Sequence, residues 1–591
     1  MKTKLTALAL GISLAYAASP AFAQATITST GSGNDAYIEQ NASSSASASI
    51  NQAGNGNRAG VPGATPSDPA SVPGILQKNS TSVAAAISQS GNSNVAGVTQ
   101  DSASNSAASV SQSGTANEAA ASQTGNNQNA SVSQSGNINK ASVTQSGANQ
   151  TATVTTSNST NGQVTVFQAD GVVAGNTATV LQDGVTNQTA TVNQFGNGQT
   201  ASLTQNAGSR EGSASVNQSG AGNTATVLQT NTWFSNASVT QQDSSNTATV
   251  TQGGLADYST ATVFQSGTDQ TATVSQSGAT YFPGGAISKG LFQATVNQTA
   301  GAANKAAVTQ SNGYQSTALV NQNGTYNQQA TVTQTGDNQN AVVTQNSGSK
   351  DGSATVTQSG NGSTANVLQT NTWSSTASVT QSGSVQTASV SQGGLADFSK
   401  AAVEQSGNNQ IASVHQSGGT VSAGNGVVQG LFEATVTQSG SSNIAGVSQT
   451  NGYKDVASVT QNGSFQTASV FQNGGNSSKA VIAQDGTLNS ASVAQNNASS
   501  SLAKITQNGN HNDAAITQGG SLLTASVAQT GDWNYANIAQ SGNGNLANIA
   551  QAGDGTSYAA RNTAAILQTG NGHVAAITQT GNTNHAAIWQ H

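Results

Sequence analysis

Residues 134–145 read QSGNINKASVTQ, and this stretch returns with small changes along most of the chain. Asn139, Ala141, Val143 and Gln145 fall at every second position. An extended strand would place these four side chains on one face, whereas a helix would spread them around its circumference. The residues between them are mostly Ser or Thr, which suit the outer face of a strand and disfavour a helix. The stretch is therefore predicted to be a β-strand with one inward and one outward face.

The residues before this strand predict a tight turn. Gln134 and Gly136 open the pattern Q-x-G-x-x-N, which supplies the glycine and asparagine that a reversal of the chain needs. About 42 such units of about eleven residues run from Ala85 to the C-terminus, and two weaker units end at Gln40 and Gln52. Because strict repetition overrides any domain count based on length, the repeats define the architecture.

Strand-turn units without helices between them leave two architectures, an antiparallel meander or a solenoid. The inward residues are too small and too polar for the thick core of a sandwich. In a solenoid each unit stacks on its equivalent one rung away, so that Gln lies on Gln and Asn on Asn. Such amides satisfy each other, as in amyloid, and a buried amide without a partner would cost about 1 to 3 kcal/mol. We therefore expect an all-β, amyloid-like β-solenoid with two units per rung, about 22 rungs and a length on the order of 100 Å.

A longer period is superimposed on the short one. Residues 229–233 (QTNTW) return at 369–373, an offset of 140 residues that is close to six rungs. Segments 279–293 and 419–433 are insertions at matching places in this period. Each is either a degenerate strand or a protruding loop, and a six-rung block that keeps its register favours the strand. The candidate strand residues are Ala286-Ile287 and Val427-Val428.

The N-terminal part differs from the array. Residues 1–23 combine an early Lys pair, an apolar stretch and a final Ala-Phe-Ala, which predicts a secretory signal peptide cleaved between Ala23 and Gln24. Residues 24–80 hold the two weak units and a proline-rich segment. We interpret 61–80 as a loop or hinge before the repeat array of 81–591, because proline removes a donor that a ladder needs.

Composition narrows the functional classes. Cysteine is absent, so a secreted chain of 591 residues would do without disulfides. Only 6% of residues are charged and the net charge is −7, which leaves no basic stripe for nucleic acid. Long charged side chains normally keep protein surfaces apart, so their scarcity indicates surfaces that tolerate contact.

The repeat resembles the curlin repeat of bacterial curli, which has the order Q-x-G-x-x-N-x-A-x-x-x-Q. The unit at 134–145 matches it position for position, and the unit at 405–416 matches with Gln410 in place of Asn. The resemblance covers most of residues 81–591, with about four times the repeats of a curlin subunit, so the chain would be an unusually long member. Ladder residues carried by the pattern include Gln405, Gly407, Ala412, Gln416, Gln579 and Gln590.

The resemblance implies a function without catalysis or cofactor. A curlin-like subunit is exported through an outer-membrane channel, polymerises with itself or with other curlin-like subunits, and forms functional amyloid on the bacterial cell surface for adhesion and biofilm matrix. The last unit, AAIWQH, stops on a strand ending at Gln590. Since an unpaired strand edge is a template for another chain, growth by end-to-end stacking is the expected mode of assembly.

Candidate sites of other kinds carry less weight. The five histidines fall at different phases of the repeat without metal-ligand spacing, and no catalytic triad, carboxylate pair or phosphate loop is present. Turn aspartates could bind calcium, but the runs of G-G-x-G-x-D that calcium-binding solenoids use are absent; interruption of uncontrolled aggregation is the favoured role. The residues concerned are His415, His511, His573, His585 and His591, and Asp183, Asp243, Asp337, Asp485 and Asp532.

Three rival functions remain open. Outward threonine pairs, at Thr189/Thr191, Thr224/Thr226 and Thr271/Thr273, suggest ice binding, although many units substitute Ser, Asn or Ala. A monomeric adhesin or ligand-binding rod would need a distinct binding domain, for which only residues 24–80 are available. A disordered Gln/Asn-rich coat conflicts with the strict phase of the repeats.

Outward aromatic residues fit either surface scatter or lateral and adhesive contacts; they are Phe167, Phe264, Phe471 and Trp589, with Trp233 and Trp373 in turns.

Overall fold

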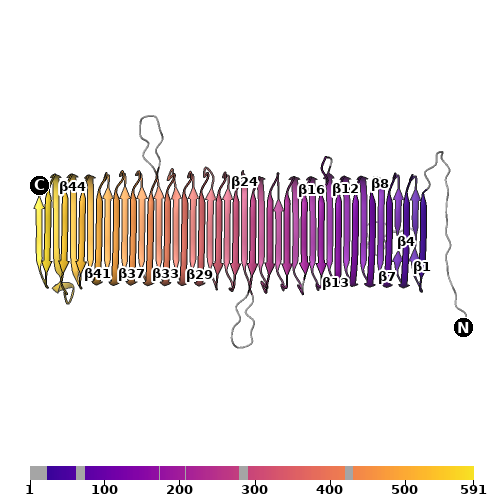
Figure 1. The fold of residues 1–591 in the computed structure, drawn as a ribbon, viewed down its shortest axis with the longest axis horizontal. Coiled ribbons are helices and arrows are strands. Elements are labelled where there is room, and N and C mark those ends of the chain that lie inside the picture. Colours follow the sequence, from indigo (N-terminus) through magenta and orange to yellow (C-terminus); the bar gives the residue numbers. More distant parts are fainter. Residues whose placement is uncertain (1–22, 61–73, 172, 207, 279–289, 419–429) are drawn as a thin grey trace, which may run out of the picture.

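The computed structural model describes residues 23–60, 74–171, 173–206, 208–278, 290–418 and 430–591. These residues form a parallel β-solenoid of about 23 turns, drawn in Figure 1 as a straight row of strands. The described residues contain no α-helix, and their one 3-10 helix is η2 (Tyr558–Ala560). The predicted all-β solenoid with two strand-turn units per rung is confirmed, with one rung more than expected.

Consecutive strands alternate between two parallel sheets, and one strand from each sheet makes a rung. Sheet A contains 23 strands: β1 (Gln24–Thr30), β4 (Ser47–Asn55), β7 (Ala84–Asn92), β9 (Ala107–Thr115), β11 (Asn129–Asn137), β13 (Thr151–Thr160), β15 (Thr177–Asp183), β17 (Thr200–Asn206), β19 (Thr224–Thr230), β21 (Thr247–Gly253), β23 (Thr271–Ser277), β25 (Lys305–Ser311), β27 (Gln329–Thr335), β29 (Ser353–Asn361), β31 (Thr376–Ser384), β33 (Lys400–Asn408), β35 (Glu433–Ser441), β37 (Val456–Ser464), β39 (Lys479–Thr487), β41 (Leu502–Asn510), β43 (Thr524–Thr530), β45 (Leu546–Ala552) and β47 (Val574–Thr580).

Sheet B has the same number of levels, because β2 and β3, and likewise β5 and β6, are halves of one interrupted strand. Its strands are β2 (Asp35–Ala36), β3 (Ile38–Asn41), β5 (Arg58–Ala59), β6 (Ile75–Lys78), β8 (Val95–Ser104), β10 (Glu118–Asn126), β12 (Lys140–Ala148), β14 (Gln163–Gly171), β16 (Thr189–Asn197), β18 (Ser213–Ala221), β20 (Asn236–Gln241), β22 (Thr260–Thr268), β24 (Gln293–Ala302), β26 (Thr317–Asn323), β28 (Asn340–Asn346), β30 (Thr364–Thr370), β32 (Thr387–Gly393), β34 (Ile411–Ser417), β36 (Ile444–Thr450), β38 (Thr467–Asn473), β40 (Ser490–Asn496), β42 (Asp513–Ser521), β44 (Asn534–Asn543), β46 (Asn562–Asn571) and β48 (His585–Gln590).

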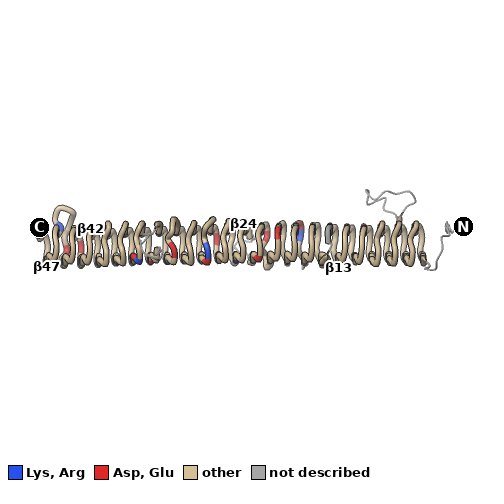
Figure 2. The backbone as a smooth tube through the Cα atoms, turned by 90° about the horizontal axis from the view of Figure 1, so that it is seen from above, with Lys and Arg blue, Asp and Glu red and all other residues tan. Residues whose placement is uncertain are grey.

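The register places like on like. In the pair β10 and β12, Ala119 lies beside Ala141 and Gln123 beside Gln145. Ala and Val of each unit point inward and are buried, as at Ala141 and Val143, so a thin core runs the length of the rod. Outward positions are mostly Ser and Thr. Figure 2 shows charged residues sparsely distributed along the rod, with basic and acidic residues side by side in places.

Glycine is required where the turns stack. Gly136 has φ +107° and Gly407 has φ +115°, a region that other residues adopt only under strain. A Cβ at Gly407 would lie 2.0 Å from the carbonyl oxygen of Gly440 on the next rung. The regular spacing between rungs therefore leaves no room for a side chain at this position of the turn.

The 140-residue block spans five and a half rungs, and the prediction of six rungs was wrong. The equivalent strands β22 and β33 are eleven strands apart, which is an odd number, so β22 lies in sheet B and β33 in sheet A. Copies of the block therefore occupy opposite sides of the rod.

The same parity argues against an extra strand in the insertions. The direct pairing of β22 with β24, and of β33 with β35, leaves no level between them for a degenerate strand. The six-rung block that favoured a degenerate strand in each insertion is therefore not observed. The candidate strand residues Ala286-Ile287 and Val427-Val428 themselves lie outside the described residues.

The segment 61–80 is predicted to be a loop or hinge, but its residues Ile75–Lys78 form strand β6. The ladder continues directly from β4 to β7 and from β3 through β6 to β8. Residues 61–73 lie outside the described part, but the flanking residues Ala59 and Ile75 both hydrogen-bond to the backbone of Tyr37. The insertion thus interrupts a single strand at an outward position, where the neighbouring strand can hold both flanks in register.

Candidate assembly interface

A glutamine ladder runs along the inner face of each sheet. In sheet B every ladder glutamine from Gln40 to Gln568 donates Nε2–H to Oε1 of the glutamine one rung nearer the C-terminus, over 2.7 to 3.0 Å, and the ladder ends at Gln590. Sheet A has the same ladder from Gln52 to Gln134 and from Gln182 to Gln579, over 2.7 to 2.9 Å. The ladders therefore link consecutive rungs through side chains as well as backbone.

The direction of the ladders is set by the backbone of the opposite sheet. Gln145 Nε2 also donates to the carbonyl oxygen of Asn129 over 3.0 Å, and Gln123 Nε2 donates to that of Ala107 over 2.9 Å. A carbonyl oxygen only accepts hydrogen bonds, so the amide nitrogen must face it. With Nε2 fixed in this way, each Oε1 is left to accept from the preceding rung.

Sheet A has one gap in its ladder, at Thr156 of β13. Within the described residues, Gln134 Nε2, Thr156 Oγ1 and Gln182 Oε1 are buried without a hydrogen-bond partner. Thr156 stands beside Gln134 on one side and Gln182 on the other. A threonine hydroxyl is too short to bridge the two amides, so the gap leaves a weak point between β11 and β15.

The asparagine of each unit does not form the expected Asn-on-Asn ladder in most rungs. Asn139 Nδ2 donates to the carbonyl oxygens of Ser135 and Ser159, and its Oδ1 accepts from the backbone N–H of Gly162. The side chain therefore ties the turn of its own rung to the next one. We call this position, two residues before the inward Ala, the corner position. Because it binds backbone, Gln, Ser or Gly can replace Asn there.

The remaining pattern residues occupy equivalent inward places. Gln405 donates to Gln438 and Gln416 to Gln449, each over 2.8 Å, and Ala412 is buried in the core.

The two ends of the rod expose unequal edges. The N-terminal edge is formed by β1 with β2 and β3, and the C-terminal edge by β47 and β48; among the described residues each of these strands pairs on one side alone. Every residue of β1 is exposed. Ser29 of β1 takes the place of the ladder glutamine beside Gln52, whose Oε1 is buried without a partner.

The expected cleavage point lies at the start of this N-terminal edge. Ala23 immediately precedes β1, and Gln24 is its first residue. The remainder of the predicted signal peptide, residues 1–22, lies outside the described residues. No helix in the described parts is long and apolar enough to cross a membrane.

A buried carboxyl, which the sequence pattern did not predict, occupies the corner position in one unit. Asp455 is fully buried, its Oδ1 accepts from the Ser478 N–H over 2.9 Å, and its Oδ2 has no partner among the described residues. Burial raises the pKa of Asp455 to about 6, and the hydrogen bond from Ser478 offsets part of this increase. Its place two residues before the inward Ala457 was the signal that could have identified it.

Two further buried aspartates belong to the repeated GGLAD motif. Asp257 Oδ1 accepts from the Trp233 N–H and Asp397 Oδ1 from the Trp373 N–H, each over 2.7 Å. Burial raises the pKa of Asp397, and the Trp373 N–H partly offsets it. Trp233 and Trp373 stay partly exposed at turns. The pair Asp257 and Trp233 lies five and a half rungs from the pair Asp397 and Trp373, so the two pairs face opposite edges of the rod.

The other candidate residues remain dispersed. The turn aspartates accept hydrogen bonds from neighbouring rungs, as when Asp532 Oδ1 accepts from the Asn510 N–H over 2.7 Å. His511 stacks on Trp533, and no group of three or more His, Asp or Glu able to hold a metal ion occurs among the described residues. The threonine pairs divide between the outer faces, Thr189/Thr191 in sheet B and Thr224/Thr226 in sheet A.

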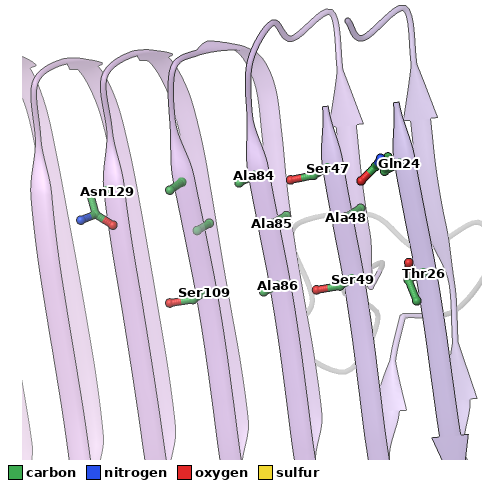
Figure 3. Close-up of a pocket in the computed structure, with 12 residues that line it drawn as sticks. Gln24, Thr26, Ser47, Ala48, Ser49, Ala84, Ala85, Ala86, Ser109 and Asn129 are labelled. Atoms are coloured by element: carbon green, nitrogen blue, oxygen red, sulfur yellow. The ribbon is translucent and has the colours of Figure 1, made fainter. Parts of the chain in front are cut away.

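The outer face also has a shallow hollow over the first rungs of sheet A. Figure 3 shows it crossing adjacent strands, where Thr26, Ser47, Ser49, Ala84 and Ala86 leave the backbone thinly covered. The lining contains no charged side chain. The hollow results from small outward residues and offers no specific polar group to a ligand.

Fold and ladders together define a class: a parallel β-solenoid repeat protein whose rungs are joined by backbone ladders and by glutamine ladders, the one in sheet A interrupted at Thr156. The curlin associated repeat matches five stretches of the chain, at residues 84–114, 103–136, 499–531, 523–553 and 559–591. The chain belongs to the curlin repeat family. No curated protein sequence matches it.

Proposed function

We propose that this protein is a structural subunit of extracellular curli-like fibres, which support cell adhesion and a biofilm matrix. Its activity is assembly, and it has no catalytic role or cofactor. The proposal includes removal of the signal peptide between Ala23 and Gln24 and export through an outer-membrane channel to the bacterial surface. Further copies of this chain are its main partner, and other curlin-like subunits could join the same fibre.

The observation that carries the proposal is the continuity of the ladders. Apart from the gap at Thr156, backbone and glutamine hydrogen bonds join each inner rung to both neighbours, while the edges of β1 and β48 are open within the described residues. An open parallel edge is a template for another strand. The curlin repeats at both ends of the array support the same role.

Fibre formation tests the proposal directly. The chain beginning at Gln24 should form fibres whose abundance rises with protein concentration, visible by electron microscopy. Fibre diffraction should give a meridional reflection at about 4.7 Å, which is the spacing of strands along the fibre axis. Protein that stays monomeric at high concentration, without this reflection, would refute the proposal.

The alternative of a monomeric adhesive rod rests on the exposed aromatic residues. Trp233, Trp373 and Trp589 are each at least 40% exposed, and rings of this kind provide adhesive contact area. A monomer that binds surfaces as well as fibres do would favour this alternative, whereas binding that appears only after assembly would favour fibres. Thermal hysteresis of the unassembled form would be the corresponding sign of ice binding.

A further inference from the structure

Two exposed aromatic clusters lie on the turns, which form the two long edges of the rod (Figure 1). The clusters are copies related by the 140-residue period, and they lie on opposite edges. The first edge cluster consists of Arg210, Glu211, Trp233, Phe234 and Tyr258, and the second edge cluster of Lys350, Asp351, Trp373, Ser374 and Phe398. The aromatic side chains of both clusters are exposed. Several large exposed rings grouped together on a protein mark an interaction surface.

The rings of each cluster form a contiguous surface. In the first edge cluster Phe234 stacks on Tyr258, with ring centroids 4.8 Å apart. In the second edge cluster the ring centroids of Trp373 and Phe398 are 5.5 Å apart. Aromatic residues, with arginine, carry most of the binding energy at the centres of protein interfaces. The two clusters therefore have the composition of interface centres.

The two edges carry their charges in opposite order across the thickness of the rod. Arg210 and Glu211 lie in the turn from sheet A to sheet B, so the basic residue is nearer to sheet A. Lys350 and Asp351 lie in a turn from sheet B to sheet A, so here the acidic residue is nearer to sheet A. All four side chains are exposed. The order is reversed because the copies are an odd number of strands apart.

From this arrangement we infer that the first edge cluster of one copy docks on the second edge cluster of a neighbouring copy. When two rods lie side by side, parallel and with their sheets aligned, Arg210 faces Asp351 of the neighbour and Glu211 faces its Lys350. The neighbour is displaced along the axis by eleven strands, or five and a half rungs, which is about 26 Å. This inference rests on the proposed fibre function and adds a contact along the sides of the rods.

The bulky side chains also match in this arrangement. Phe234 lies nearer to sheet B and faces Trp373 of the neighbour, while Trp233 lies nearer to sheet A and faces Ser374. The small serine leaves room for the indole. Two first edge clusters would instead place Trp233 against Phe234 on both sides, large against large, and two second edge clusters would bring fewer rings together. Unlike clusters are therefore the better match.

The charges also determine the relative direction of the two rods. If one rod is turned end for end, either its sheets exchange places or two copies of the same cluster meet. Arg210 would then face Lys350 or a second Arg210, and opposed like charges disfavour an association. Parallel rods avoid this repulsion. Because each copy has one cluster on each edge, the contact does not close on itself, and it extends the rods into a flat, staggered raft.

Exchange of the charges within one cluster tests this pairing without changing composition or net charge. In the variant Arg210→Glu with Glu211→Arg, like charges face each other across the contact, so we expect the fraction of paired fibres to fall roughly 10-fold or more. Adding Lys350→Asp with Asp351→Lys to the same chain should restore pairing. Mass per length, measured by scanning transmission electron microscopy on chains beginning at Gln24, distinguishes single from paired fibres.

Removal of one ring tests the aromatic contact independently. Phe234→Ser should raise the concentration needed for pairing roughly 10-fold, because it removes the ring that faces Trp373. Phe465→Ser is the matched control. Phe465 occupies the same turn position on the same edge, with φ +55° against +52° for Phe234, and lies outside both clusters. Equal losses in the two variants would overturn the inference, since pairing would then depend on exposed rings in general.

The remaining outcomes separate this inference from the proposed function. Two first edge clusters stay complementary after the exchange at 210 and 211, so unchanged pairing in that variant would show that like edges meet and would overturn the inference. Wild-type fibres that remain single at every concentration would also overturn it and leave the proposed function intact. Absence of fibres would refute the proposed function and the inference with it. Images of paired rods should show the axial offset of about 26 Å.

Discussion

Replacing Thr156 with glutamine should repair the gap in the sheet A ladder. The neighbouring rungs already hold glutamine at this position, so the inner face has the width for it. Residue 156 would accept from Gln134 Nε2 and donate to Gln182 Oε1, two atoms that are buried without partners. Thr156→Gln is thus expected to stabilise the rungs from β11 to β15.

The magnitude follows from the groups involved. Each orphaned buried amide atom costs about 1 to 3 kcal/mol, so two of them cost about 2 to 6 kcal/mol. Ordering the longer glutamine side chain costs about 1.5 to 2 kcal/mol. The net gain therefore lies in a range of roughly 0 to 4.5 kcal/mol, with a midpoint of about 2 kcal/mol. A solenoid unfolds locally rather than all at once, so this gain should appear in the affected rungs.

Hydrogen exchange followed rung by rung is the appropriate assay. Amides of β11, β13 and β15 should exchange roughly 30-fold more slowly in Thr156→Gln for the midpoint gain of about 2 kcal/mol, while those of β35 to β39 stay unchanged. Thr156→Val is the control, because it removes the orphaned hydroxyl but supplies no amide, and it should give a much smaller effect. Equal or faster exchange in Thr156→Gln would refute the idea that the ladder stabilises the rod.

Two other substitutions test the corner position and the turn. Asp455 has a folded-state pKa of about 6 against an ordinary value of 3.8, so the folded rung binds an extra proton between these two pH values. The stability of this rung is therefore greatest below pH 4 and falls by about 3 kcal/mol as the pH rises through 6. Asp455→Asn should abolish this pH dependence in the protection factors of β35 to β39, which are exchange rates corrected for the intrinsic effect of pH. A slope that persists in the protection factors would assign the pH dependence to another group. Gly407→Ala should lower the free energy of unfolding by more than about 3 kcal/mol, because its Cβ would meet the Gly440 carbonyl. Gly544 faces open space at φ +72°, so Gly544→Ala should lower it by about 1 to 2 kcal/mol, as measured by thermal unfolding or exchange. Similar costs for the two would contradict the role given to rung stacking.

Much of this fold follows from local pattern. The alternation Asn-x-Ala-x-Val-x-Gln has the period of a strand, and the Gly and Asn that follow Gln134 allow a turn, so strand, turn and inward face were all predictable. Repetition of one unit then made in-register stacking the arrangement that satisfies its buried amides. β1 and β6 escaped prediction, because Ser29 replaces the glutamine in one and the proline-rich segment interrupts the other.

The sequence by itself therefore determined the unit and its inward residues, which depend on neighbours within one repeat. It also determined the solenoid, because identical units, such as those of Gln145 and Gln168 that lie 23 residues apart, satisfy their buried amides by stacking. Only the tertiary structure decided which sheet each unit joins, because one added or missing strand reverses that assignment for all residues after it; β22 and β33 differ for this reason. It also decided the direction of the glutamine ladders, because the carbonyl that orients each amide, such as that of Asn129 for Gln145, lies in the opposite sheet. The polarity of the rod is thus a property of its packing, which no single repeat contains.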